Sequence, residues 1–126
     1  MQARIESFAA HYPCLVYETD DHRIAGYCYA HPWKEKAAYQ HTLETTIYLD
    51  PSQKGKGIGK QLMEQLVNTC RNQGHHALIA CITAENRPSC AFHEALGFEQ
   101  VSLFKEVGIK FGRLLDVADY ELILDK

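Results

Sequence analysis

The stretch that decides the fold is residues 44–60, which read Glu44-Thr45-Thr46-Ile47-Tyr48-Leu49-Asp50-Pro51-Ser52-Gln53-Lys54-Gly55-Lys56-Gly57-Ile58-Gly59-Lys60. A β-branched run ends at Asp50-Pro51, and a loop with three alternating glycines then leads into an amphipathic pattern. Glycines at a helix start leave backbone N–H groups uncrowded at the positive end of the helix dipole. Such a turn suits a phosphate-type anion. The alternative is a strand–helix turn in which the glycines only permit a tight bend.

The spacing of the glycines excludes two common phosphate loops. A Walker loop requires G-x-x-x-x-G-K-[ST], whereas Lys60 is followed by Gln61. The dinucleotide fingerprint requires G-x-G-x-x-G with an acidic residue about 20 positions later, and neither is present. The segment Lys54-Gly55-Lys56-Gly57-Ile58-Gly59 instead resembles the acyl-CoA pyrophosphate loop Q/R-x-x-G-x-G/A of the GCN5-related N-acetyltransferases (GNAT), with Lys at the Q/R position.

Composition narrows the class of protein. The chain has 126 residues, 46% hydrophobic and 23% charged, which predicts one globular domain over residues 1–126. The net charge of -3 provides no basic field for nucleic acid. No apolar run reaches the length of a membrane span, and no signal-peptide pattern is visible. The five cysteines form no C-x-x-C pair, which favours free thiols in a reducing cytoplasm over a disulfide framework or a metal site.

Hydrophobic periodicity predicts an α/β domain with a mixed sheet. Strands are expected at residues 14–19, 23–30, 41–49, 77–83, 98–107 and 114–124, and helices at 57–73 and 86–96. Residues 1–12 are predicted to be the end of a helix, because Ile5, Phe8 and Ala9 have helical spacing. Gly26 lies inside a strand, where it is unfavourable unless another backbone approaches closely. Ligands of such βαβ units bind at the carboxyl ends of the strands, where the glycine loop lies.

Four further motifs are similar to the phosphinothricin / methionine sulfoximine N-acetyltransferases. They are Pro32-Trp33-Lys34-x-Lys36-x-Ala38-Tyr39, Thr42-Leu43-Glu44-Thr45-Thr46-Ile47-Tyr48, Asn86-x-Pro88-Ser89-x-x-x-His93-Glu94-x-Leu96-Gly97-Phe98 and Val107-Gly108-Ile109-Lys110-Phe111-Gly112-Arg113-x-Leu115-Asp116-Val117. The resemblance implies a GNAT fold, a mixed and mostly antiparallel sheet flanked by helices, with acetyl-CoA as cofactor and a homodimer. The family's N-terminal strand and helix have no counterpart here. We therefore expect a shortened fold in which the strand at 14–19 is an exposed edge unless a partner or swapped segment covers it.

The same resemblance assigns roles to individual residues. Glu44, on the polar face of its strand, would be the general base for the acceptor amine, the alternative being a half-exposed surface carboxylate. His93 would assist proton movement, the alternative being a solvated histidine on a helix face. The residues expected to bind acetyl-CoA are Ile47, Tyr48, Leu49, Lys54, Gly55, Lys56, Gly57, Ile58, Gly59, Lys60, Asn86 and Ser89, with Asn86 also capping its helix.

The acceptor site is expected to include Trp33, Lys34, Lys36 and Tyr39. Lys36 stands where the family that the chain resembles more usually has Arg. The planar guanidinium of Arg can bind a carboxylate with two hydrogen bonds, whereas the Lys ammonium acts as a point charge. Trp33 fits a core position equally well. Residues 110–113 fit a hairpin turn that packs near the acceptor or at a dimer contact.

These assignments imply transfer of an acetyl group to the amino group of a small amino-acid-like acceptor, of the phosphinothricin, methionine sulfoximine or methionine sulfone type. One alternative is acetylation of another amine, such as a polyamine, an aminoglycoside or a peptide N-terminus. Another is a non-catalytic CoA-binding module. Cys81 and Cys90 raise the idea of a covalent acetyl-thiol intermediate, but the sequence suggests no base paired with either.

Overall fold

The computed structural model describes residues 4–8 and 12–124. Its strands are β1 (Arg4–Phe8), β2 (Cys14–Glu18), β3 (Ile24–Pro32), β4 (Thr42–Leu49), β5 (Ala77–Thr83), β6 (Glu99–Lys110) and β7 (Arg113–Ile123). The α-helices are α1 (Ile58–Asn72) and α2 (Arg87–Ala95), and the short 3-10 helices are η1 (Ala37–Tyr39) and η2 (Pro51–Gln53). No helix within the described ranges is long and apolar enough to cross a membrane.

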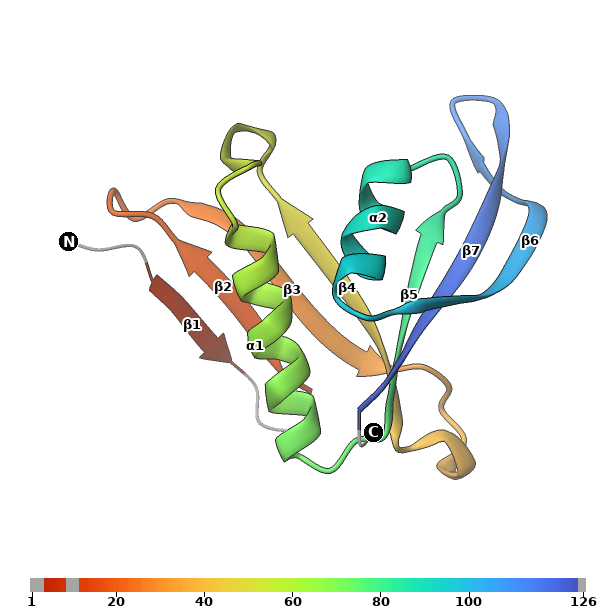
Figure 1. The fold of residues 1–126 in the computed structure, drawn as a ribbon, viewed down its shortest axis with the longest axis horizontal. Coiled ribbons are helices and arrows are strands. Elements are labelled where there is room, and N and C mark those ends of the chain that lie inside the picture. Colours follow the sequence, from red (N-terminus) through yellow and green to blue (C-terminus); the bar gives the residue numbers. More distant parts are fainter. Residues whose placement is uncertain (1–3, 9–11, 125–126) are drawn as a thin grey trace.

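The strands form one sheet in the order β1-β2-β3-β4-β5-β7-β6. Among the strands of the described residues, β4 and β5 are the only parallel neighbours, and the other neighbours are antiparallel. The predicted mixed, mostly antiparallel sheet is therefore confirmed. Both helices lie on the same face, with α1 over the β2–β4 side and α2 over the β5–β7 side (Figure 1).

The core lies between the sheet and the two helices. The apolar stripe of α1 buries Leu62, Leu66 and Cys70 in the same cluster as Leu15 of β2 and Cys28 of β3. Buried and more exposed residues alternate along much of β3, because the helices cover only one face of the sheet and successive side chains point to opposite faces. Tyr27, Tyr29 and His31, which alternate with the buried residues Cys28 and Ala30, point to the opposite face, where neighbouring rings contact each other.

Gly26 is explained by the close approach of β3 and β4. A Cβ atom at this position would lie 2.8 Å from the carbonyl oxygen of Tyr48 and 3.0 Å from Cδ1 of Leu49. The sequence expectation of a close backbone contact at Gly26 is confirmed.

The predicted helix over residues 1–12 is wrong for residues 4–8. Residues 4–8 form strand β1, which pairs antiparallel with β2, and the expected helix residues 1–3 and 9–11 lie outside the described residues. A helix this short has little stability of its own, whereas pairing satisfies the backbone groups of β2. Ile5 packs against the core, and Arg4 lies 3.3 Å from Glu18 in an ion pair. The expected exposed edge at 14–19 is also wrong, because the outer strand is β1.

Candidate functional site

Strands β4 and β5 part in the middle of the sheet. They pair only from Thr42 to Thr45 on β4 and from Ala77 to Ala80 on β5. Beyond Thr45, β4 continues to Leu49 with β3 as its only strand partner, while β5 continues beside β7 (Figure 1). The edge of residues 46–49 that faces β5 therefore has backbone groups free to pair with an extended ligand.

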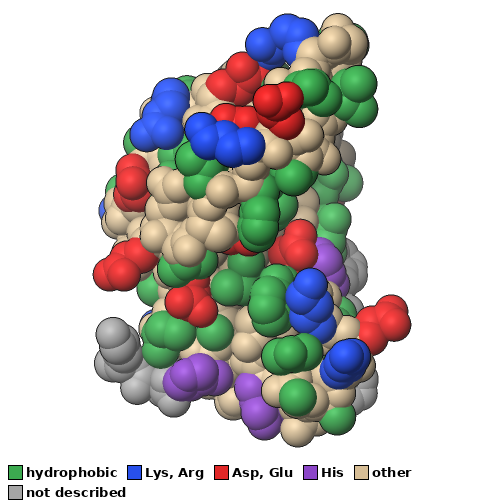
Figure 2. All heavy atoms as spheres, turned by 90° about the vertical axis from the view of Figure 1, so that its right-hand side faces the viewer, with side chains coloured by type: hydrophobic (Ala, Val, Ile, Leu, Met, Phe, Trp, Pro, Cys, Tyr) green, Lys and Arg blue, Asp and Glu red, His purple; other side chains and the backbone are tan. Residues whose placement is uncertain are grey.

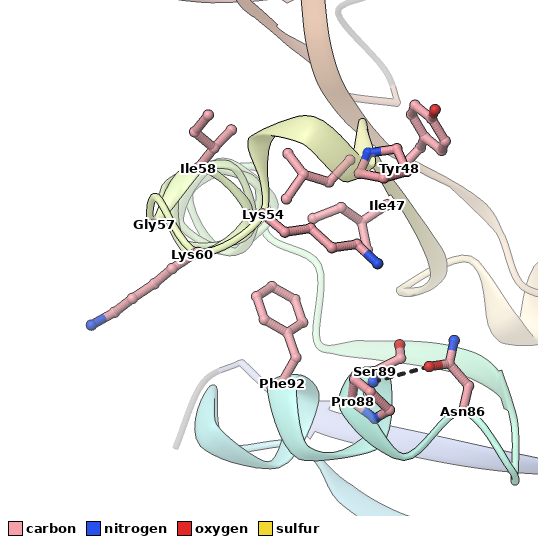
Figure 3. Close-up of a pocket in the computed structure, with 14 residues that line it drawn as sticks. Ile47, Tyr48, Lys54, Gly57, Ile58, Lys60, Asn86, Pro88, Ser89 and Phe92 are labelled. Carbon is pink, nitrogen blue, oxygen red and sulfur yellow. Dashed lines mark hydrogen bonds between the residues drawn. The ribbon is translucent and has the colours of Figure 1, made fainter.

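A cleft of about 590 Å³ opens beside this free edge, between β4, the start of α1 and α2 (Figure 3). This volume is in the range of small-molecule sites. The lining residues are Ile47, Tyr48, Leu49, Pro51, Lys54, Gly55, Gly57, Ile58, Gly59, Lys60, Asn86, Pro88, Ser89 and Phe92. The structure thus brings together the residues expected to bind the cofactor, with the exception of Lys56.

The glycine loop ends in an open helix N-terminus. Gly55 and Gly57 have φ values of 82° and 76°, in the left-handed region that favours glycine. Gly57 is the N-cap of α1 and provides no side-chain hydrogen bond to the first turn. The first N–H groups of this 15-residue helix therefore remain available for an anion.

The lysines of this loop have different positions. Lys54 and Lys60 line the cleft, although the Lys60 side chain extends outward from the helix start (Figure 3). The Nζ atom of Lys56 donates a hydrogen bond of 3.2 Å to Oε1 of Gln53 within the loop. Lys56 therefore braces the loop in this structure.

Helix α2 forms the opposite wall. The Oδ1 atom of Asn86 accepts a hydrogen bond of 3.3 Å from the backbone N–H of Ser89, which confirms the predicted cap (Figure 3). Because capping uses only the amide oxygen, the NH₂ group of Asn86 can donate to a ligand. Phe92 points toward α1, where a Cβ atom on Gly59 would lie 3.4 Å from its ring. Gly59 thus permits close contact between the helices.

The sequence analysis missed three lining residues: Pro51, Pro88 and Phe92. The signal for Phe92 was its helical spacing, three residues after Ser89 and four after Pro88, which places all three on one face of the helix. No comparable signal identified Pro51.

Glu44 lies on the face of the sheet opposite the helices. Its register partners are His31 on β3 and Ile79 on β5, one residue before β4 and β5 part. Its side chain is 31% exposed, and its Oε2 atom lies 3.9 Å from Nε2 of His31. Glu44 therefore stands beside the gap between the two strands but is not part of the cleft lining.

Cys81 lies on the same open face and is exposed. Burial raises the pKa of its thiol, and the negative charges of Asp119 and Glu44 raise it further. A neutral thiol is a poor nucleophile. The structure thus gives no support to a covalent acetyl-thiol intermediate at Cys81.

His93 lies inside the protein. It is 3% exposed, its Nδ1 atom is 2.9 Å from the carbonyl oxygen of Ser89, and its ring makes edge contacts with Phe92 and Phe98. Burial lowers the pKa of the imidazole, partly opposed by the contact with Ser89. The expectation of a solvated helix-face histidine is therefore wrong. His93 does not line the cleft, and its role in proton movement stays a prediction.

The four expected acceptor residues lie on the segment that joins β3 to β4. The rings of Trp33 and Tyr39 meet edge to face with centroids 5.5 Å apart, and Nζ of Lys34 lies 5.0 Å from the centre of the Trp33 ring. Trp33 is half-buried and outside the core cluster, so the core alternative is wrong. Lys36 is exposed at the start of η1.

Sequence comparison relates the chain to acetyltransferases. The acetyltransferase (GNAT) family matches residues 2–98. The L-amino acid N-acyltransferase MnaT of Escherichia coli (strain K12) is 36% identical over 117 residues, which cover 93% of this chain and 67% of that protein. An L-methionine sulfoximine/L-methionine sulfone acetyltransferase of Salmonella typhimurium is 35% identical over 115 residues, which cover 91% of this chain and 67% of that protein.

Comparison with solved structures supports the same relationship to acetyltransferases. A phosphinothricin acetyltransferase from Sinorhizobium meliloti, solved in complex with acetyl-CoA, has a TM-score of 0.85 and 41% identity over 90% of this chain and 61% of that one. The present chain spans about two thirds of the length of these two curated relatives. The match over most of its residues, with the same fold, shows that the chain belongs to the acetyltransferase (GNAT) family.

Proposed function

We propose that this protein is an acetyl-CoA-dependent N-acetyltransferase that acts on the amino group of a small amino-acid-like acceptor. The observation that carries the proposal is the free backbone edge of residues 46–49, with the open N-terminus of α1 at one end and Glu44 at the other. The names of the relatives, an L-amino acid N-acyltransferase and a methionine sulfoximine/methionine sulfone acetyltransferase, support this acceptor class.

The residues of the cleft fit acetyl-CoA, which when bound supplies the acetyl thioester. The N–H groups of the glycine loop and of the first turn of α1 would hold its pyrophosphate. The free edge at Ile47 and Leu49 would pair with its pantetheine amides as an added strand does, and the NH₂ group of Asn86 would donate to the same arm. Apolar contacts would come from Ile58 and Phe92.

Glu44 would remove the proton that prevents the acceptor amine from reacting. An amino group is mostly an ammonium at neutral pH and has no free electron pair for attack. The Glu44 carboxylate, beside the gap between β4 and β5, would take this proton directly or through one water. A backbone N–H of the free edge would donate to the carbonyl oxygen as negative charge develops on it.

Transfer would be direct, from thioester to amine within one ternary complex. The raised pKa of the Cys81 thiol disfavours that side chain as an intermediate carrier of the acetyl group. The amine nitrogen forms the new bond to the acetyl carbon, and the carbon–sulfur bond breaks to release the thiol. Proximity and orientation in the cleft would supply much of the rate.

Lys34 and Lys36 favour an anionic acceptor. Both are exposed on the segment after β3 that also carries Trp33 and Tyr39, close in sequence to the Glu44 end of the sheet. Their positive charge would attract the carboxylate and acidic side chain of an amino-acid acceptor. The same charge disfavours polyamines and aminoglycosides.

The β6–β7 hairpin supports a homodimer. The outer strand β6 is 12 residues long, and exposed hydrophobic side chains follow the hairpin, including Ile109 at 73% and Phe111 at 93% exposure. Figure 2 views the molecule from this side, where hydrophobic patches lie between the charged side chains. A long edge strand with apolar side chains is a surface that proteins usually cover.

One sheet and one core cluster support treating residues 1–126 as a single acetyltransferase domain. The proposed compartment is the cytoplasm, because the five cysteines are free thiols.

The test is release of CoA thiol from acetyl-CoA with methionine sulfone, phosphinothricin, spermidine and an aminoglycoside as acceptors. We expect turnover with the first two only. Calorimetry with acetyl-CoA alone provides the control for cofactor binding. Cofactor binding without turnover of any amine would favour a CoA-binding module, and the absence of cofactor binding would refute the assignment of the cleft.

A further inference from the structure

His31 is placed against the proposed general base by strand register. It lies directly opposite Glu44 on the neighbouring strand, and its Nε2 atom is 3.9 Å from the carboxylate Oε2. The sequence analysis did not assign His31 a role. Both side chains are partly exposed, at 42% and 31%, on the sheet face that the helices leave open. An acceptor ammonium that reaches Glu44 must therefore approach beside this imidazole.

Whether the His31 ring attracts the Glu44 carboxylate depends on which of its two nitrogens carry a hydrogen. Its Nδ1 atom is 3.1 Å from the carbonyl oxygen of Pro32, and a carbonyl can only accept a hydrogen bond. Nδ1 is therefore the protonated nitrogen of the neutral ring, and Nε2 then presents a lone pair to the Glu44 carboxylate. Only the imidazolium, with a hydrogen on both nitrogens, can donate to Pro32 and to Glu44 together.

We propose that His31 is a positioning residue that competes with the acceptor ammonium for Glu44. When protonated, it pairs with the carboxylate and adds a positive charge where the ammonium must bind. When neutral, it leaves the carboxylate open to the acceptor. This inference rests on the proposed function, since it takes Glu44 as the group that receives the amine.

Few other side chains near His31 and Glu44 are of a type that changes charge between pH 5 and 8. On β3, Tyr29 lies 5.9 Å from the imidazole between ring centroids. On β5, burial raises the pKa of the Cys81 thiol, and the negative charge of Glu44 raises it further. Asp119 of β7 lies beside that thiol. Other titratable or charged side chains on the bordering segments include Tyr27, Lys34, Glu35, Lys36, Tyr39, His41, Tyr48, Asp116, Tyr120 and Glu121. Of these, only His41 is of a type that ordinarily changes charge between pH 5 and 8.

The expected effect is on acceptor binding, with a definite sign. At about pH 8.5, above the range in which histidine side chains ordinarily change charge, replacement of His31 should leave the acceptor KM unchanged. At about pH 5.5 the imidazolium should weaken acceptor binding about threefold to fivefold relative to His31→Gln, the size expected of a partly exposed ion pair. The acetyl-CoA KM should be equal in both proteins, because the cleft is on the helix side of the sheet.

The experiment measures binding of methionine sulfone to the protein saturated with CoA, by calorimetry at both pH values, and then the acceptor KM and kcat with acetyl-CoA. The ratio of wild type to His31→Gln at each pH cancels any titration of the acceptor itself. His41→Gln controls for the other nearby histidine. His22→Gln is a matched control, because Nδ1 of His22 lies 3.6 Å from Glu18 in a similar pair at the β2–β3 turn.

We expect the ratio of dissociation constants to rise as pH falls for His31→Gln alone, with kcat less affected than KM. A ratio that is the same at both pH values, or tighter wild-type binding in acid, would overturn the role of His31 while leaving the proposed function intact. Absence of methionine sulfone binding at either pH, despite CoA binding, would overturn the proposed acceptor class and this inference with it.

Discussion

Replacing Gly26 by Ala tests the close approach of β3 and β4 on which the cleft edge depends. The new Cβ atom would lie 2.8 Å from the carbonyl oxygen of Tyr48 and 3.0 Å from Cδ1 of Leu49. The leucine methyl can rotate away, but the carbonyl belongs to the backbone of β4. Relief therefore requires displacement of the strand that carries the free edge.

The expected change in the free energy of unfolding of Gly26→Ala is the difference between two opposing effects. Overpacking of this kind costs about 1–3 kcal/mol, while the loss of glycine flexibility in the unfolded chain returns about 0.4–1 kcal/mol. We expect a net loss of about 1–2 kcal/mol in the free energy of unfolding, or about 3–10 °C in Tm for a domain of this size. Binding of acetyl-CoA should weaken as well, because the displaced carbonyl lies next to the backbone that lines the cleft.

The assay is chemical and thermal unfolding, with calorimetry for acetyl-CoA binding. Gly108→Ala is a matched control on β6, where the nearest atom to a new Cβ is Cβ of Leu115 at 3.6 Å, an ordinary contact. This control should be as stable as the wild type and bind the cofactor equally. Equal stability of Gly26→Ala and Gly108→Ala would refute the reasoning.

Three further predictions concern other parts of the site and core. Gly57→Ala forces a left-handed φ of 76° on alanine and should cost about 1–2 kcal/mol of stability and weaken acetyl-CoA binding, whereas Gly112→Ala, with a φ of 75° in the distant hairpin, should lose stability alone when both are measured by calorimetry. Cys81→Ser should retain turnover, since a thiol with a raised pKa is not the nucleophile, and loss of turnover in this variant would contradict the prediction. The lowered pKa of His93 means that the unfolded chain binds a proton that the folded state resists, so stability is lost as pH falls below about 6.5. Urea unfolding at about pH 7.5 and 5.5 should show a smaller loss for His93→Gln than for the wild type, and equal losses would disprove the effect of His93.

The sequence was most informative where structure depends on neighbouring residues. Strand β4, the glycine loop, α1 and the Asn86 cap were all predicted, because periodicity and capping residues act within a few positions. Most of the cleft lining followed from that unit, since one loop and one strand carry most of the lining residues.

The sequence was least informative where distant segments pair. Residues 4–8 have helical spacing, but the pairing with β2 decides their structure. His31 meets Glu44 only through the register of β3 and β4, which no local pattern reveals. The parting of β4 from β5 after Thr45 is likewise a property of the sheet, and the burial of His93 depends on Phe98, outside its own helix.

The most direct test of the proposed chemistry is formation of acetylated methionine sulfone by wild type, Glu44→Gln and the control Glu99→Gln, measured by mass spectrometry at about pH 7 and pH 9. Glu99 is an exposed carboxylate at the start of β6. We predict that Glu44→Gln lowers the rate at pH 7 by about 10²–10⁴-fold, and that the deficit shrinks at pH 9 as the free amine becomes abundant. Acetyl-CoA binding and the Glu99→Gln rate should stay at wild-type values. Equal rates for Glu44→Gln and wild type at pH 7 would contradict the role of Glu44 as the base.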